Sequence, residues 1–241
     1  MNKFFTGFAL AVSCVMLLSA SIFAQRRRAA NPNDSIASNY NPQELFTPSF
    51  YAEKGNEFHS PDGSPGPKYW QNKVDYQLNA KIDTVNKVLS ATENISYTNN
   101  SPAALPYLWL QLDQNTYLKT ARSNFVTGRA ATEHTNGYEF ESVEIVINGK
   151  AQTVNYLVND TRMQIRLPNA VAGQGGKINL QIKYHYQIPG TFGNRTDYNQ
   201  TKNGKIYEIA QWFPRMCVYD DSSGWDTLPF LGAGEFYLEY G

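Results

Sequence analysis

The stretch 178-INLQIKYHYQI-188 decides the fold class. Apolar and polar residues alternate along it without interruption. Such a period of two places the two sets on opposite faces of a β-strand, one buried and one solvated. The apolar set is Ile178, Leu180, Ile182, Tyr184, Tyr186 and Ile188, and the polar set is Asn179, Gln181, Lys183, His185 and Gln187.

Further strands are predicted on the N-terminal side of this one. Residues 76–82 alternate in the same way, and a turn over 83–87 leads to a second run in which Leu89, Ala91, Ile95 and Tyr97 face one way. The two runs predict a hairpin. Residues 105–112 are apolar on both faces, which predicts a central strand covered on both sides.

Asn148-Gly149 is the best two-residue hairpin turn in the chain. A return strand is predicted over 153–158 and another over 163–167. A last strand begins at 236–240 and stops at Gly241, so we expect the chain to be truncated. No window of comparable length has helical periodicity. The fold class is therefore all-β: an antiparallel β-sandwich or a curved, saddle-like open sheet after an irregular N-terminal arm.

The N-terminus has the layout of an export signal. One Lys precedes an uncharged apolar run over residues 4–24, which predicts a signal peptide at 1–24 and an exported protein, periplasmic or extracellular. An uncleaved membrane anchor is the alternative, because the run is long enough to span a bilayer and Arg26–Arg28 follow it. Residues 25–67 are rich in Asn, Pro, Ser and Gly and predict an irregular arm or linker. The β-domain is expected over 68–241.

Composition narrows the choice of partners. The chain has 21 Lys+Arg and 21 Asp+Glu, so nucleic acid is not an expected partner. Removing the signal takes Cys14 with it and leaves Cys217 alone, which excludes an internal disulfide.

The sequence predicts no metal site within this chain. His59, His134 and His185 are not spaced to share a metal, and none belongs to an H-E-x-x-H motif. Asp220, Ser222 and Asp226 could offer oxygen ligands to calcium, but their spacing fits Asx-turn caps better.

The segment 207-YEIAQWFPRMCVYDDSSGWD-226 interrupts the strand pattern. Pro214 removes a backbone donor, and 220–224 is rich in turn-forming residues. Trp212 and Trp225 lie on either side of this turn region. The segment predicts a corner pinned by tryptophans, with polar groups at its rim.

Four segments together resemble the N-terminal β-domain of zinc aminopeptidases of the aminopeptidase N type, in a bacterial branch. They are PGPKYWQN at 65–72, ISYTNNSPAALPYLWLQLDQN at 95–115, AQWFPRMCVYDDSSGW at 210–225 and LGAGEFYLEYG at 231–241. The resemblance implies a thermolysin-like catalytic domain following in cis, with zinc held by H-E-x-x-H and a downstream Glu, and an exopeptidase motif G-x-M-E-N. This chain contains none of those motifs, so we expect it to be inactive alone and to hold no cofactor itself.

The resemblance also implies a role for the β-domain. In that family a Gln or Glu near the end of one strand binds the free N-terminal ammonium of the peptide substrate. Such an ammonium offers three donors and no acceptor, so it requires oxygen ligands. Alignment on Tyr207 points to Gln211, and alignment backwards from Asp220 points to Glu208. Gln211 is preferred because it directly precedes the break at 212–214.

A different function class remains open. A free-standing periplasmic or surface β-domain would bind a carbohydrate or a protein through exposed aromatic residues such as Trp109, Trp212 or Trp225.

Overall fold

The computed structural model describes residues 55–126, 133–190, 195–231 and 237–239. All of them belong to one compact unit, Gly55–Gly241. This unit is built from antiparallel strands, with two short 3-10 helices, η1 (Asp113–Tyr117) and η2 (Arg122–Phe125). The predicted all-β fold class is confirmed.

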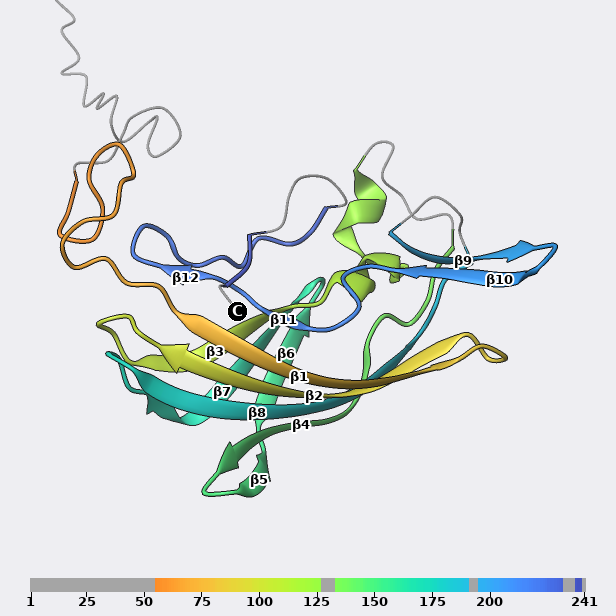
Figure 1. The fold of residues 1–241 in the computed structure, drawn as a ribbon, viewed down its shortest axis with the longest axis horizontal. Coiled ribbons are helices and arrows are strands. Elements are labelled where there is room, and N and C mark those ends of the chain that lie inside the picture. Colours follow the sequence, from red (N-terminus) through yellow and green to blue (C-terminus); the bar gives the residue numbers. More distant parts are fainter. Residues whose placement is uncertain (1–54, 127–132, 191–194, 232–236, 240–241) are drawn as a thin grey trace, which may run out of the picture. The chain divides into compact units, whose positions relative to one another are not determined.

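Five strands form the larger sheet, in the order β1–β2–β8–β4–β5 (Figure 1). The predicted hairpin is confirmed as β1 and β2, in which Tyr76 lies opposite Ile95 and Asp83 opposite Val88. The bounds are β1 Lys73–Asp83, β2 Val88–Asn99, β4 Glu139–Ile147, β5 Lys150–Thr153 and β8 Gly176–Gln187.

Strand β8 is the middle of this sheet, paired with β2 on one side and β4 on the other. Its alternation has the predicted consequence. Leu180, Ile182, Tyr184 and Tyr186 are at most 1% exposed, whereas the intervening polar residues are exposed or half-buried.

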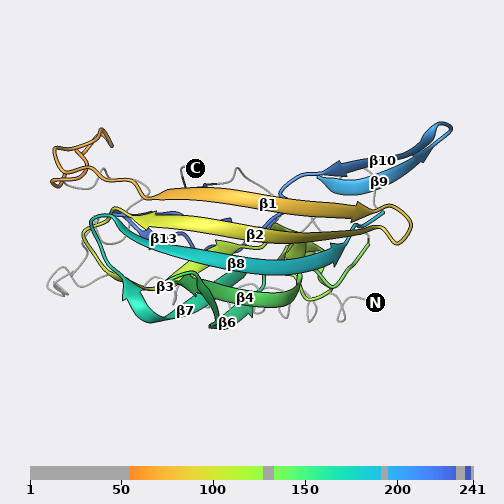
Figure 2. The same ribbon diagram turned by 60° about the horizontal axis from the view of Figure 1, so that its bottom comes forward.

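Four strands form a second sheet, in the order β11–β3–β7–β6, and run obliquely to β1, β2 and β8 (Figures 1 and 2). Their bounds are β3 Leu105–Gln111, β6 Asn155–Asn159, β7 Arg162–Val171 and β11 Arg215–Met216. The predicted strand over 105–112 is confirmed as β3, an interior strand of this sheet. The prediction that both its faces are covered is wrong for its first half. The ladder shifts register between Leu105 and Tyr107, and both Pro106 and Tyr107 are exposed.

The predicted return strand over 153–158 is corrected. The chain switches sheets there: β5 pairs with β4 of the larger sheet, and β6 pairs with β7 of the smaller one. Between them Val154 is buried, and its amide donates to Val143 O at 3.3 Å. A strand that changes sheet makes a corner of a two-sheet structure, and an apolar run alone does not reveal it.

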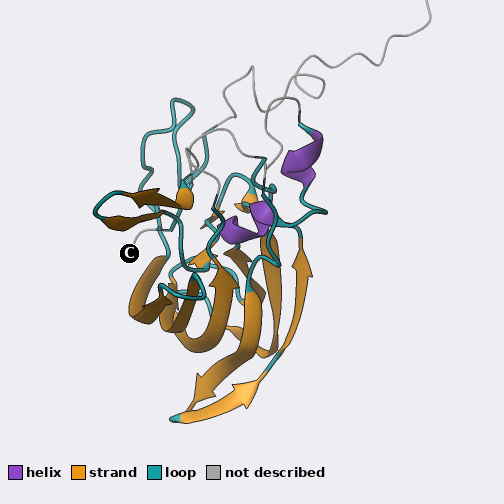
Figure 3. Cartoon of the chain, turned by 90° about the vertical axis from the view of Figure 1, so that its right-hand side faces the viewer, coloured by secondary structure: helices purple, strands orange, loops and turns teal. Residues whose placement is uncertain are grey.

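The core lies between the two sheets and draws on both of them. The larger sheet contributes Val74, Leu89, Ile95, Tyr97, Val143, Ile145, Leu180 and Ile182, and the smaller one contributes Leu105, Leu108, Leu110, Met163, Ile165 and Met216. Both 3-10 helices and most loops gather on one side of these layers (Figure 3).

Two further pairs of strands complete the fold of the described residues. β9 (Thr196–Thr201) and β10 (Gly204–Ile209) form a hairpin that projects beyond the sheets (Figure 2). β12 (Tyr219–Asp220) and β13 (Gly224–Trp225) form a very short one.

Some predictions fall outside the described residues. The signal peptide, residues 25–54 of the arm, and Phe236 and Tyr240 of the predicted last strand are among them. Residues 237–239 are described and form no strand. No helix within the described part of the chain has the length and apolar character needed to cross a bilayer.

Candidate functional site

A bend follows strand β10 and contains the first predicted site residue, Gln211. The amide of Ala210 still donates to Arg195 O at 2.8 Å, and then the backbone of Gln211 turns to a φ of 47°. This left-handed conformation is uncommon for a residue with a side chain. Among the described residues, three of the other four such residues, Lys87, Asn148 and Asp160, lie in turns between paired strands. Gln174 lies in the turn between β7 and β8, which belong to different sheets, and the bend at Gln211 likewise lies between strands of different sheets, β10 and β11.

The buried side chain of Gln114, in η1, holds the bend by hydrogen bonds, and we call these contacts the clamp. Gln114 is 3% exposed, and its Nε2 faces Gln211 O at 3.0 Å, Ala210 O at 3.2 Å and Thr196 Oγ1 at 3.1 Å. The hydroxyl of Tyr138 also donates to Gln211 O, at 3.4 Å. Burial raises the pKa of Tyr138 well above its ordinary value, so the hydroxyl stays protonated and remains a donor. Buried side chains thus fix the bend.

The two predicted site residues lie differently. Gln211 is half-buried in the bend, and its side-chain amide forms no hydrogen bond to the described residues. Glu208 is exposed on β10, opposite Asp197 of β9. Both belong to one short segment, and the geometry leaves both within the candidate site.

The residues after the bend close it against the core. The ring of Phe213 packs edge-on against Tyr76 at 5.3 Å and against Trp212 at 5.0 Å. The hydroxyl of Tyr184 reaches Trp212 O at 3.5 Å. Trp212 and Phe213 therefore pack against the hydrophobic core and partly cover it.

A buried ion pair anchors the same region. Arg215 contacts Asp113, whose side chain also accepts a hydrogen bond from Gln111 Nε2 at 2.6 Å. Asp113 directly precedes Gln114, so neighbouring residues of η1 hold both the bend and the start of β11. The sequence did not reveal this pair, because its members are 102 positions apart and neither belongs to a motif.

Glu93 is a second residue that the sequence analysis missed. It lies on β2 with its side chain inward, is 0% exposed, and neither carboxylate oxygen has a hydrogen-bond partner among the described residues. Burial raises its pKa well above the ordinary 4.5. The sequence does hold a signal: Glu93 has the same parity as Leu89, Ala91, Ile95 and Tyr97, the predicted inward set.

The corner over 220–226 forms a different polar region. The Oδ1 of Asp220 accepts hydrogen bonds from Ser222 N at 3.1 Å, Ser222 Oγ at 3.0 Å and Ser223 N at 2.7 Å. The predicted Asx-turn cap is therefore confirmed at Asp220. Asp226 Oδ1 accepts from Leu228 N at 3.4 Å. Among the described residues, no three His, Cys, Asp or Glu side chains are grouped as metal ligands.

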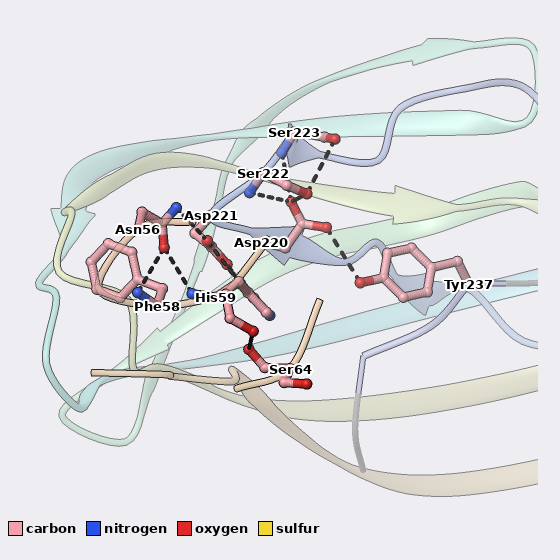
Figure 4. Close-up of polar contacts among 10 residues, drawn as sticks. Asn56, Phe58, His59, Ser64, Asp220, Asp221, Ser222, Ser223 and Tyr237 are labelled. Carbon is pink, nitrogen blue, oxygen red and sulfur yellow. Dashed lines mark hydrogen bonds and ion pairs between the residues drawn. The ribbon is translucent and has the colours of Figure 1, made fainter. Parts of the chain in front are cut away.

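The described part of the arm, 55–67, is tied to this corner (Figure 4). His59 Nδ1 lies 2.7 Å from Asp221 Oδ1, and Asn56 Nδ2 donates to Asp221 Oδ2 at 3.3 Å. Partial burial disfavours the charged form of Asp221, but the hydrogen bonds from His59 and Asn56 outweigh it, so the pKa of Asp221 is lowered.

Aromatic rings pin the corner as predicted. Trp225 stacks on Tyr97 at 6.3 Å and packs against Tyr219 at 5.2 Å. The prediction of exposed tryptophans is wrong, because Trp109, Trp212 and Trp225 are all partly buried. Cys217 is a buried free cysteine, and burial raises its pKa to about 12, which makes it an unreactive thiol.

The solved structures that match this chain include two of one enzyme. No protein-family model and no curated protein matches this sequence. A mutant M1 zinc metallopeptidase from Deinococcus radiodurans is 16% identical, with a TM-score of 0.35, over 56% of this chain and 25% of that one. The same mutant with a bound Tyr-Ser-Ala substrate is also 16% identical at a TM-score of 0.35, over 70% of this chain and 31% of that one. This chain spans less than a third of either.

Proposed function

We propose that this chain is the N-terminal β-domain of an exported zinc-dependent aminopeptidase, and that it supplies the group that recognises the free amino end of the substrate. One observation carries the proposal: Gln211 has a left-handed backbone two residues after β10 ends and is held there by buried side chains. Such a conformation costs about 1–3 kcal/mol and clusters at functional sites. The four segments that resemble aminopeptidase N-type enzymes support the choice of this family.

The chemistry of Gln211 suits an ammonium ligand. Its backbone oxygen is occupied by Gln114 and Tyr138, which fix the backbone while leaving the side-chain Oε1 without a partner among the described residues. An ammonium needs such oxygen acceptors. The hydrogen bonds to the backbone carbonyl fix the position from which the Gln211 side chain extends. Glu208, a carboxylate two residues before the bend begins at Ala210, is the alternative amine ligand.

Catalysis is assigned to a domain outside this chain. In the proposed full-length enzyme a zinc ion would supply an activated water for attack on the first peptide carbonyl. This chain would bind and orient the amino end of the substrate and form one wall of the cleft. The partners are thus a peptide with a free N-terminus and a thermolysin-like domain in cis.

Kinetics of the full-length enzyme test the proposal. Replacing Gln211 by Ala removes a charge-assisted hydrogen bond worth about 1.5–3 kcal/mol, so KM for unblocked peptides should rise about 10- to 100-fold. Gln200→Ala, at an exposed Gln of the β9–β10 hairpin, is the matched control and should change nothing. A rise in KM at Glu208→Ala instead would move the role to Glu208. No effect at either residue would refute the proposal.

A further inference from the structure

A pocket lies at the corner, and residues 210–214 of the bend do not line it. It is lined by His59 of the arm, residues 69–71, residues 218–222 and residues 237–239. Its volume is about 140 Å³. The lining residues that matter here are Tyr69, Trp70, Asp220, Asp221, Tyr237 and Glu239.

Aromatic rings form much of the wall. Trp70 stacks on Tyr219 with their centroids 5.8 Å apart, and Tyr69 packs edge-on against His59 at 5.1 Å. Tyr237 is 56% exposed at the rim. Ring faces carry partial negative charge and attract cations.

The charged groups of the wall are predominantly acidic. Three carboxylates line the pocket, and no Lys or Arg does. Asp221 is paired with His59. Asp220 has no cationic partner among the described residues: its Oδ1 holds the turn, and its Oδ2 accepts only from the Tyr237 hydroxyl, at 3.3 Å. Burial and the nearby Asp220 and Glu239 carboxylates raise the pKa of Tyr237 to about 12, which agrees with a negative local potential.

We propose that this pocket binds a small organic cation, an alkylammonium or guanidinium group. Carboxylates and ring faces together are the surroundings that such groups prefer. The size agrees, because a cavity of about 150 Å³ accommodates a ligand of roughly six non-hydrogen atoms. The cation is either a free small amine or guanidine, or the side chain of a Lys or Arg in a polypeptide.

Calorimetric titration of the full chain at low salt tests the charge requirement. Ethylguanidinium is the probe, and ethylurea is its uncharged counterpart of the same shape. We expect ethylguanidinium to bind with a dissociation constant on the order of 1 mM and ethylurea to bind at least about tenfold more weakly. Equal binding of the two, or no binding of ethylguanidinium, would overturn the proposal.

Two carboxylate variants test whether ethylguanidinium binds in this pocket. Asp220→Asn keeps an oxygen that can accept the hydrogen bonds of the turn but removes the charge, so ethylguanidinium affinity should fall about tenfold. Asp226→Asn is the matched control, since Asp226 belongs to the same corner but not to the pocket wall. Circular dichroism confirms that both variants fold. Equal affinity in the two variants would contradict the assignment.

A capped Gly-Arg-Gly peptide distinguishes a free small cation from the side chain of a polypeptide as the ligand of the pocket. Tighter binding of the peptide than of ethylguanidinium identifies a polypeptide side chain as the ligand, and weaker or equal binding identifies a free small cation. Either result supports the cation site. The readout is binding to this chain, and Gln211 does not line the pocket, so failure here leaves the proposed aminopeptidase role unaffected.

Discussion

The bend at Gln211 and the corner at Asp220 are both polar interruptions of the sheets, but they are built in opposite ways. The bend depends on buried groups from distant parts of the chain, above all Gln114 and the ion pair of Asp113 with Arg215. The turn at the corner is closed by hydrogen bonds that Asp220 accepts within three residues of itself. Distant side chains hold the left-handed backbone of Gln211 in place, whereas the turn at Asp220 is closed by its own neighbours. This difference is why we assign substrate recognition to the bend.

The largest expected effect is at the buried ion pair. Asp113→Ala leaves the Arg215 guanidinium buried without its carboxylate, and the free energy of unfolding should fall by about 3–5 kcal/mol. Urea denaturation of the full chain measures it. The control is Asp75→Ala, which removes an exposed carboxylate paired with Lys73 and should cost about 1 kcal/mol or less. Equal losses in both variants would show that the ion pair does not anchor the bend.

Glu93, whose buried carboxylate has no hydrogen-bond partner among the described residues, should give the next largest effect. Its pKa is raised by folding, so above pH 4.5 the folded state retains a proton that the unfolded state has lost. Stability should therefore fall with rising pH, by about 1.4 kcal/mol per pH unit, until the pH passes the folded-state pKa. Glu93→Gln should remove this slope and be more stable at pH 7. Urea denaturation from pH 4 to pH 8 measures both variants, and an unchanged slope contradicts the account of Glu93.

The corner should respond much more weakly. The pKa of Asp221 is lowered by folding, so its contribution is present above pH 3.8 and is lost as the pH falls below that value. Asp221→Asn should cost about 1 kcal/mol or less at pH 7, because the pair with His59 is partly solvated. Limited proteolysis should nevertheless show faster cleavage in residues 55–67. An arm that stays equally protected would mean that other contacts hold it.

The same comparison explains what the sequence could predict. The strand at 178–188, the hairpin of 76–82 with 89–97, and the Asx-turn at Asp220 are governed by residues close in sequence, and all three were predicted. The change of sheet at Val154 was not, because residues 153–158 are equally suited to one strand, and only packing divides them. The hydrogen bonds of Gln114 and the buried ion pair of Asp113 were not predicted either. Both gain these partners only when η1 meets a segment about 100 residues later, at separations of 97 and 102 residues.

Replacing Gln211 by Gly tests most directly the central claim that the bend recognises the substrate amine. Gln211→Gly relieves the left-handed backbone and should raise the free energy of unfolding by about 1 kcal/mol, while removing the amine ligand. In the full-length enzyme we therefore predict higher stability together with a KM for unblocked peptides at least about tenfold higher. A glycine variant that is more stable and keeps its KM would show that the strain serves no recognition of the substrate amine.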